Sequence, residues 1–210
     1  DMLKRPVESF KYLLTTIEKN ILVLPSSTAN LDLVFFGTTN EKHLDAFKTM
    51  PDFSSFRSRF HLLTVPYLLR PSLEMNIYSK DIETIQKNTP ISPHTLNVLC
   101  TWAVMTRLKQ PDPEHYPTNK RALISRLEPE DKIRLYEAKQ LRSAFKSDED
   151  GTLSDMRWEI LSESKGTLVY EGRFGASPRE VKQILYHAAQ IQGHKTLTPV
   201  SIFEELEHLV

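Results

Sequence analysis

The 210-residue sequence has little cysteine and little glycine, and each shortage excludes a class of structure. Its single cysteine, Cys100, cannot form a disulfide within the chain, which is typical of a reducing, cytoplasmic setting. Only six glycines are present, so tight hairpins are not expected to dominate. No apolar run approaches the roughly 20 residues that span a bilayer, so we expect no membrane partner.

No charge of either sign prevails. Lysine and arginine together number 27, and aspartate and glutamate also number 27, so the formal net charge is zero. A protein that binds nucleic acid needs a basic surface to displace counterions from the phosphates. The balanced composition therefore gives no reason to expect nucleic acid as a partner.

Two features that hold a nucleoside triphosphate are missing from the sequence. No glycine is followed by lysine, so there is no Gly-x-x-x-x-Gly-Lys loop to cradle phosphates. No apolar segment ends in a pair of adjacent acids that would hold Mg²⁺. We therefore expect that this chain alone does not hydrolyse ATP.

The first third of the chain nevertheless has the character of an α/β domain. Leu31–Phe36 is almost entirely apolar, as expected of a strand that is covered on both faces, and Phe60–Val65 is a second candidate strand. A short helix or turn is expected between them, over residues 44–50. The fold class predicted for residues 1–66 is therefore part of an α/β domain with a parallel sheet.

Helical patterns replace strands after Pro66. Ser177-Pro-Arg-Glu180 combines a capping residue, a proline at the first helical position and a glutamate at the third, and Thr198-Pro199 predicts the start of a last helix. A charged helix is predicted over residues 128–145, and a polar turn over residues 147–151. The second part should therefore be an all-α bundle, which makes the chain predominantly α overall.

Asn40 is a candidate for contact with a ligand. It follows the first predicted strand, and ligands of open α/β sheets gather at the carboxyl ends of the strands. A carboxamide there can orient a water molecule or contact a γ-phosphate. The alternative is that Thr39 and Asn40 only cap the helix that follows.

Three arginines are further candidates. Arg57 and Arg59 precede a predicted strand, where an arginine can reach the nucleotide of a neighbouring subunit and neutralise charge on the transferred phosphoryl group. Arg179 lies in the first turn of a predicted helix, where a cation is unfavourable for the helix dipole but a bound phosphate would be favourable. The alternatives are solvated surface arginines and, for Arg179, a surface ion pair with Glu180 or another neighbour.

The order of these parts resembles the AAA+ ATPase domain, from just after its Mg²⁺-binding strand, and most closely that of the PrkA-type bacterial serine protein kinases. The resemblance covers most of the chain. It is carried by the order and spacing of these stretches: Asp1–Pro6 with Tyr12–Thr16, Thr39–Glu41, Phe56–Phe60 running into Val65–Arg70, Ile77–Tyr78, Ser92–Leu96, Thr106–Lys109, Gly175–Arg179 and Thr198–Pro199.

The resemblance implies specific roles. Asn40 would be the sensor-1 residue, Arg59 the finger and Arg179 the sensor-2 residue, which contacts the phosphates in cis. Arg57 stays open as the alternative finger. The resemblance also implies ATP and Mg²⁺ as cofactors of the intact protein, an upstream P-loop segment and a homo-oligomer, and it allows a protein substrate.

The same resemblance implies a domain organisation. Residues 1–66 would complete the AAA+ core, residues 67–195 would form a helical lid over the nucleotide, and residues 196–210 would begin the next helical segment. The competing class is a non-catalytic helical scaffold or a winged-helix-like regulatory module built from residues 70–210.

Overall fold

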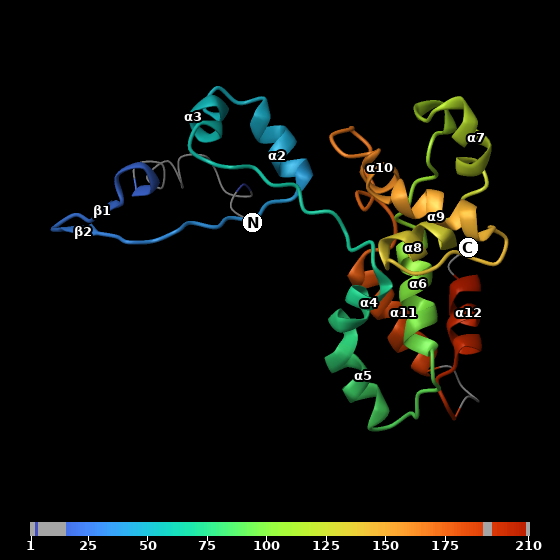
Figure 1. Cartoon of the computed structure of the whole chain (residues 1–210). Helices are drawn as coiled ribbons and strands as arrows, with labels where there is room; N and C mark the ends of the chain where they lie inside the picture. The colour runs from blue at the N-terminus through green and yellow to red at the C-terminus, as the bar shows by residue number, and fades with distance from the viewer. Residues whose placement is uncertain (1–2, 4–15, 191–194, 209–210) are drawn as a thin grey trace. The chain divides into compact units, whose positions relative to one another are not determined.

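The structure is a computed structural model that describes residues 3, 16–190 and 195–208. The chain divides into two compact units, residues 1–64 and 65–210, which are taken separately below (Figure 1). The spacing of Val7, Phe10, Leu14 and Ile17 predicts a helix over residues 5–19, and most of that range lies outside the described residues.

The first unit has a small hairpin and two short helices. Strands β1 (Ile21–Val23) and β2 (Thr28–Asn30) pair antiparallel, with Leu22 opposite Ala29. Helices α2 (Glu41–Lys48) and α3 (Phe53–Arg57) follow. They pack through aromatic rings, because Phe47 of α2 contacts Phe53 and Phe56 edge to face at centroid distances of 5.8 and 4.9 Å.

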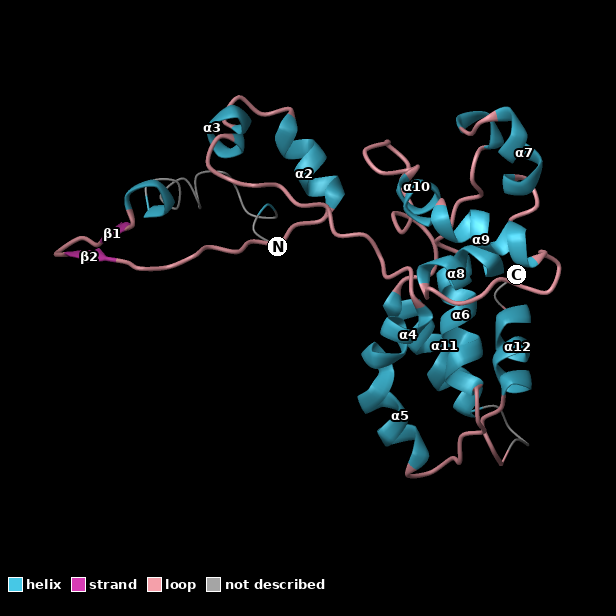
Figure 2. Cartoon of the chain, viewed as in Figure 1, coloured by secondary structure: helices cyan, strands magenta, loops and turns pink. Residues whose placement is uncertain are grey.

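The predicted parallel sheet is wrong. Leu31–Phe36 and Phe60–Val65 are loops (Figure 2), and the hairpin of β1 and β2 is the one sheet in the described part of the chain. A strand needs a neighbour for its backbone N–H and C=O groups, and an apolar strand also needs layers that cover both faces. The described residues supply neither, and the Phe36 side chain is 89% exposed.

The second unit is helical, which confirms the predicted bundle and the predominance of helix. Helix α6 lies at its centre and contacts α4, α8, α11 and α12 (Figure 1). The helices are α4 (Pro71–Glu74), α5 (Ser79–Gln86), α6 (Thr95–Met105), α7 (Thr118–Ile124), α8 (Pro129–Tyr136), α9 (Ser147–Asp155), α10 (Arg157–Ser162), α11 (Pro178–Gln190) and α12 (Pro199–Glu207), with 3-10 turns at Met75–Tyr78 and Pro113–His115.

Two hydrophobic clusters stabilise this unit. The first joins residues that are distant in sequence, because side chains from the region of α5 and α6 meet those of α11 and α12. Its buried members are Tyr78, Ile85, Leu99, Cys100, Ala103, Val181, Ile184, Leu185, Ala188, Leu197 and Ile202. The second cluster is formed by α7 to α10 and the loops between them; its members include Ile124, Leu135, Leu153 and Ile160.

Predictions from helix-start signals differ in outcome. The starts of α11 and α12 are confirmed, and Thr198 caps α12 by accepting the Ser201 N–H at 3.2 Å. The charged helix ends early, at Tyr136, and Ala138 then has a left-handed φ of 55°. The predicted turn at residues 147–151 is instead the start of α9, because acids in a first turn complement the helix dipole.

Gly172 permits a close approach that no other residue allows. Its φ is +78°, and a Cβ added there would lie 2.7 Å from the backbone oxygen of Tyr67. Gly151 is the opposite case, because it lies inside α9 and a Cβ there would meet nothing within 4 Å.

We therefore expect opposite effects from one substitution at these two glycines. Gly172→Ala should lower the free energy of unfolding by about 2 kcal/mol or more, through backbone strain and the clash with Tyr67. Gly151→Ala should raise it by roughly 0.5–1 kcal/mol, because alanine favours the helix. Urea denaturation followed by tryptophan fluorescence measures both, since Trp102 and Trp158 lie in the second unit. A neutral Gly172→Ala would contradict this packing.

Candidate functional site

Asn40 is the N-cap of α2. Its Oδ1 accepts the backbone N–H of His43 at 3.2 Å, and its backbone is extended with φ −85° and ψ 158°. The capping role considered from the sequence is therefore real. The cap occupies only the oxygen of the carboxamide, and the amide nitrogen of this exposed side chain keeps two N–H donors.

Arg59 forms an ion pair within its own unit. Its Nη2 and Nε donate to Oε2 of Glu18 at 2.7 and 3.0 Å, and its Nη1 donates to the backbone oxygen of Ser55 at 2.9 Å. Both partners are partly solvated, with 30% of the Arg59 side chain and 52% of the Glu18 side chain exposed. This pair was not foreseen, because the two residues are far apart in sequence.

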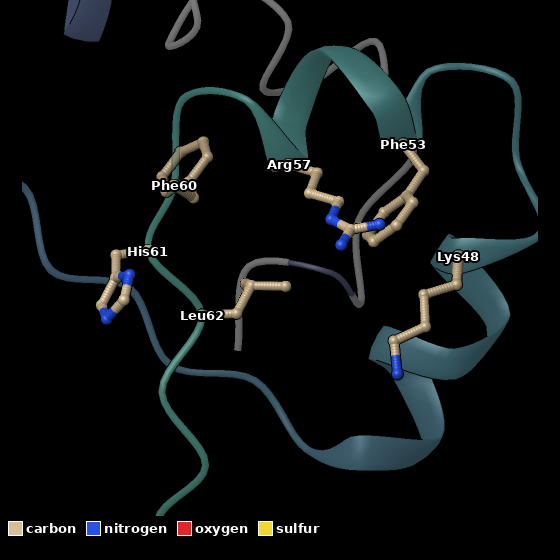
Figure 3. A pocket seen from close by; sticks show the side chains of 6 residues that line it. All are labelled: Lys48, Phe53, Arg57, Phe60, His61 and Leu62. Carbon is tan, nitrogen blue, oxygen red and sulfur yellow. The ribbon is translucent and has the colours of Figure 1, made fainter.

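Arg57 is the last residue of α3, and its side chain lines a shallow hollow. The hollow has a volume of about 510 Å³ and combines two cations with apolar walls (Figure 3). Its lining residues are Lys48, Phe53, Arg57, Phe60, His61 and Leu62. The guanidinium of Arg57 makes no ion pair with any residue in the described part of the first unit.

Asn40 and this hollow lie at opposite ends of α2. Asn40 precedes the helix and Lys48 is its last residue, so the eight residues of α2 separate the two by about 12 Å along the axis. The structure therefore does not gather Asn40 and Arg57 around one small ligand inside the first unit. It places the carboxamide at one end of the helix and the hollow that Arg57 lines toward the other.

Arg179 occupies the second position of α11, in the second unit. Ser177 precedes the helix; its Oγ accepts the Glu180 N–H at 3.3 Å, and its own N–H donates to the Glu180 carboxylate at 2.7 Å. These hydrogen bonds hold the pKa of Glu180 below its ordinary value. Because Glu180 is engaged with Ser177, the expected alternative of a Glu180 ion pair is not observed, and the exposed Arg179 makes no ion pair with the described residues.

A buried ion pair that the sequence did not reveal contacts the loop that precedes Arg179. Arg107 and Glu74 are both fully buried, and Nη1 and Nη2 of Arg107 donate to the two Glu74 oxygens at 2.8 Å each. Glu74 also accepts the Tyr78 hydroxyl at 2.7 Å, and burial together with this hydrogen bond raises the pKa of Tyr78. Arg107 belongs to a stretch that carries the family resemblance, but neither its spacing nor its neighbours point to Glu74.

The remaining chemistry-bearing groups near this site are structural. Burial raises the pKa of the Cys100 thiol to about 12, so it stays protonated in the core. Lys132 forms a buried ion pair with Glu171, which also accepts the Tyr136 hydroxyl at 2.5 Å. Across residues 16–190 and 195–208, no three His, Cys, Asp or Glu side chains come together as ligands for a metal ion. None of the helices in the same ranges has the length and apolar character needed to cross a membrane.

Comparison with known families assigns both halves of the chain. The PrkA AAA domain matches residues 1–115, and the PrkA serine protein kinase C-terminal domain matches residues 131–210. The chain belongs to the PrkA family. In this PrkA chain, Asn40, Arg57 and Arg59 fall within the AAA match, and Arg179 falls within the C-terminal match.

Two curated relatives illustrate the similarity. The chain is 30% identical to the ATP-dependent protease PrkA of Bacillus subtilis strain 168 over 183 residues. The match covers 86% of this chain and 25% of that protein. The chain is 28% identical over 120 residues to the serine/threonine kinase YeaG of Escherichia coli K12, covering 53% of this chain and 18% of that protein. The chain thus spans about a quarter or less of these relatives. No solved structure matches it.

The cap and any ligand role of Asn40 can be separated. Asn40→Ala should raise the exchange rate of the His43 amide and destabilise α2 by about 1 kcal/mol, because the N–H loses its acceptor. Asn40→Asp should keep that protection, since a carboxylate caps equally well. Hydrogen exchange followed by NMR measures both; equal exchange in the two variants would contradict the capping geometry.

Proposed function

We propose that this chain contributes sensor and finger residues to an ATP-hydrolysing AAA+ module of a PrkA-type serine protein kinase. Residues 1–66 complete the nucleotide-binding core, residues 67–195 form the lid and residues 196–210 lead onward. The observation that carries the proposal is the start of α11. There, a capping box turns Glu180 inward to Ser177 and leaves the Arg179 guanidinium exposed at the positive end of a 13-residue helix.

The donor sets suit a triphosphate. A guanidinium with five N–H donors and a carboxamide with two offer hydrogen bonds to anionic oxygens and no competing negative charge. When bound, ATP would supply the phosphoryl group that is transferred, and Mg²⁺ would be held by acids outside this chain. Arg179 would bind the phosphates in cis, and the Asn40 amide would orient the attacking water.

A finger role fits the hollow that Arg57 lines, because Lys48 at the end of α2 also lines it and Asn40 caps the other end of that helix. The carboxamide would then serve the protomer's own nucleotide and an arginine a neighbour's. Arg59 is the proposed finger and Arg57 the alternative. An exposed ion pair contributes only about 0–1 kcal/mol, so Glu18 would not prevent Arg59 from turning to a phosphate.

The central test uses the intact protein in an oligomer. Arg59→Ala should lower ATP turnover by about 1,000-fold or more and leave ATP binding unchanged, because the finger acts on the transition state of a neighbour. Arg179→Ala should weaken ATP binding about tenfold or more, because it removes a charged hydrogen bond. Steady-state turnover and equilibrium binding of a fluorescent ATP analogue measure these effects, and Arg57→Ala measured in parallel identifies which of the two arginines is the finger.

Mixing two inactive variants tests the trans arrangement. Asn40→Asp keeps the α2 cap but places a carboxylate beside the phosphate, so it should abolish turnover in its own site. Mixed in equal amounts with Arg59→Ala, it should restore activity at roughly one site in four, where an intact Asn40 faces a neighbour's intact Arg59. No recovery in a mixed oligomer, or full activity of Arg59→Ala together with Arg57→Ala, would reject the finger role.

A second candidate is a non-catalytic helical scaffold. One observation favours it, because residues 65–210 contain both larger hydrophobic clusters and hold together without a sheet. This reading predicts that Arg179→Ala and Arg59→Ala leave ATP binding and turnover of the intact protein unchanged, and the experiments above therefore distinguish the two.

A further inference from the structure

The loop that leads into α11 is fixed by one side chain. Arg107, which follows α6, donates from Nε to the backbone oxygen of Ala176 at 2.9 Å. One residue earlier, the Thr106 hydroxyl accepts the Ala176 N–H at 2.8 Å. The backbone N–H and C=O of Ala176 are therefore both held by the two residues that follow α6. Ala176 itself lies two residues before Pro178 and three before Arg179.

The same arginine also holds the chain where the second unit begins. Its Nη1 donates to the backbone oxygen of Leu68 at 2.8 Å, and its guanidinium carbon lies 5.2 Å from the centroid of the Tyr67 ring. The Tyr67 N–H donates to the Gly172 oxygen at 2.8 Å, and the Gly172 N–H donates to the Arg107 oxygen at 3.0 Å. Segment 67–70 and the loop before α11 thus meet at Arg107.

Glu74 makes this arrangement rigid. Its carboxylate accepts hydrogen bonds from both terminal nitrogens of Arg107 in a bidentate pair. The plane of the guanidinium is therefore fixed, and so are the directions of the Nε and Nη1 hydrogen bonds to Ala176 and Leu68. Lysine cannot substitute, because a single ammonium cannot reach Glu74, Leu68 and Ala176 from one position. Glycines complete the contact: a Cβ at Gly175 would lie 2.5 Å from the Thr106 oxygen.

We infer that Arg107 and Glu74 are positioning residues for Arg179. The pair fixes the start of α11 against segment 67–70, the stretch that follows the first unit, and so sets where the Arg179 guanidinium is presented to a nucleoside triphosphate. Arg107 itself is buried and touches no ligand. The inference rests on the proposed function, because it assigns to Arg179 a contact with ATP.

The test is a double-mutant cycle in the intact protein. Arg107→Lys should weaken ATP binding about tenfold, because a displaced Arg179 no longer meets the phosphates. Arg107→Lys combined with Arg179→Ala should bind ATP no more weakly than Arg179→Ala alone, because both changes remove the same contact. Additive losses would overturn the positioning role.

Arg142→Lys is the matched control for loss of a bidentate pair. Arg142 donates from Nε and Nη2 to the buried carboxylate of Asp131 at 2.7 and 2.6 Å, and its third partner is Glu128, so it makes none of the hydrogen bonds to Leu68 and Ala176. It should lower the unfolding temperature but leave ATP affinity unchanged. Equal weakening of ATP binding by Arg142→Lys and Arg107→Lys would mean that the effect is general destabilisation, and would overturn the inference.

A readout that needs no nucleotide completes the design. Hydrogen exchange measured by mass spectrometry on peptides that cover residues 172–180 should rise in Arg107→Lys and stay unchanged in Arg142→Lys. Unchanged exchange in Arg107→Lys would overturn the inference. If Arg179→Ala itself leaves ATP affinity unchanged, the proposed function fails and the positioning role fails with it; if only Arg107→Lys behaves like its control, the positioning role alone fails.

Discussion

The buried ion pair between Arg107 and Glu74 is the interaction on which the second unit depends. Removing two charges from water costs several kcal/mol each, so such a pair persists only where further hydrogen bonds complete its donors and acceptors. Here the backbone oxygens of Leu68 and Ala176 accept from the guanidinium, and the Tyr78 hydroxyl donates to the carboxylate. The pair and its partners come from four segments, at Leu68, Glu74–Tyr78, Arg107 and Ala176, so the cost of burial is offset only when all four are in place. The pair thereby specifies one arrangement of the unit.

The packing of the second unit also joins residues from the two family matches. The first hydrophobic cluster takes Leu99 and Ala103 from the AAA match and Val181, Leu185 and Ile202 from the C-terminal match. Helices on the two sides of residues 116–130 therefore share one close-packed core, and a core of this kind transmits displacement rather than absorbing it. A displacement of α6 would therefore be transmitted to α11 and α12, which lie within the C-terminal match.

The sequence predicted what is encoded locally. The starts of α11 and α12 depend on caps within four residues, and both were found in advance. The strands at Leu31–Phe36 and Phe60–Val65 were wrong, because an apolar run specifies burial but not the partner that receives its hydrogen bonds. The first half of helix α9 was predicted as a polar turn, whereas the Glu149 carboxylate accepts the Lys146 N–H and favours a helix start there. Arg107 was present in a recognised stretch, but its partner lies 33 residues away, at a distance that no local pattern reports.

The arginines of this chain differ in the free energy needed to displace their side chains from their partners. Breaking a buried pair by displacing one partner costs about 3–5 kcal/mol, which exceeds what one phosphate contact returns, so Arg107 is committed to the fold. Arg59 is held by a partly exposed ion pair with Glu18 and by one hydrogen bond to the Ser55 oxygen. An exposed pair contributes about 0–1 kcal/mol, so displacing the Arg59 guanidinium costs much less. Arg179 has no such ion pair with Glu180, because Ser177 already engages that carboxylate. Burial thus separates Arg107, which stabilises the fold, from Arg59 and Arg179, whose side chains remain accessible at the surface.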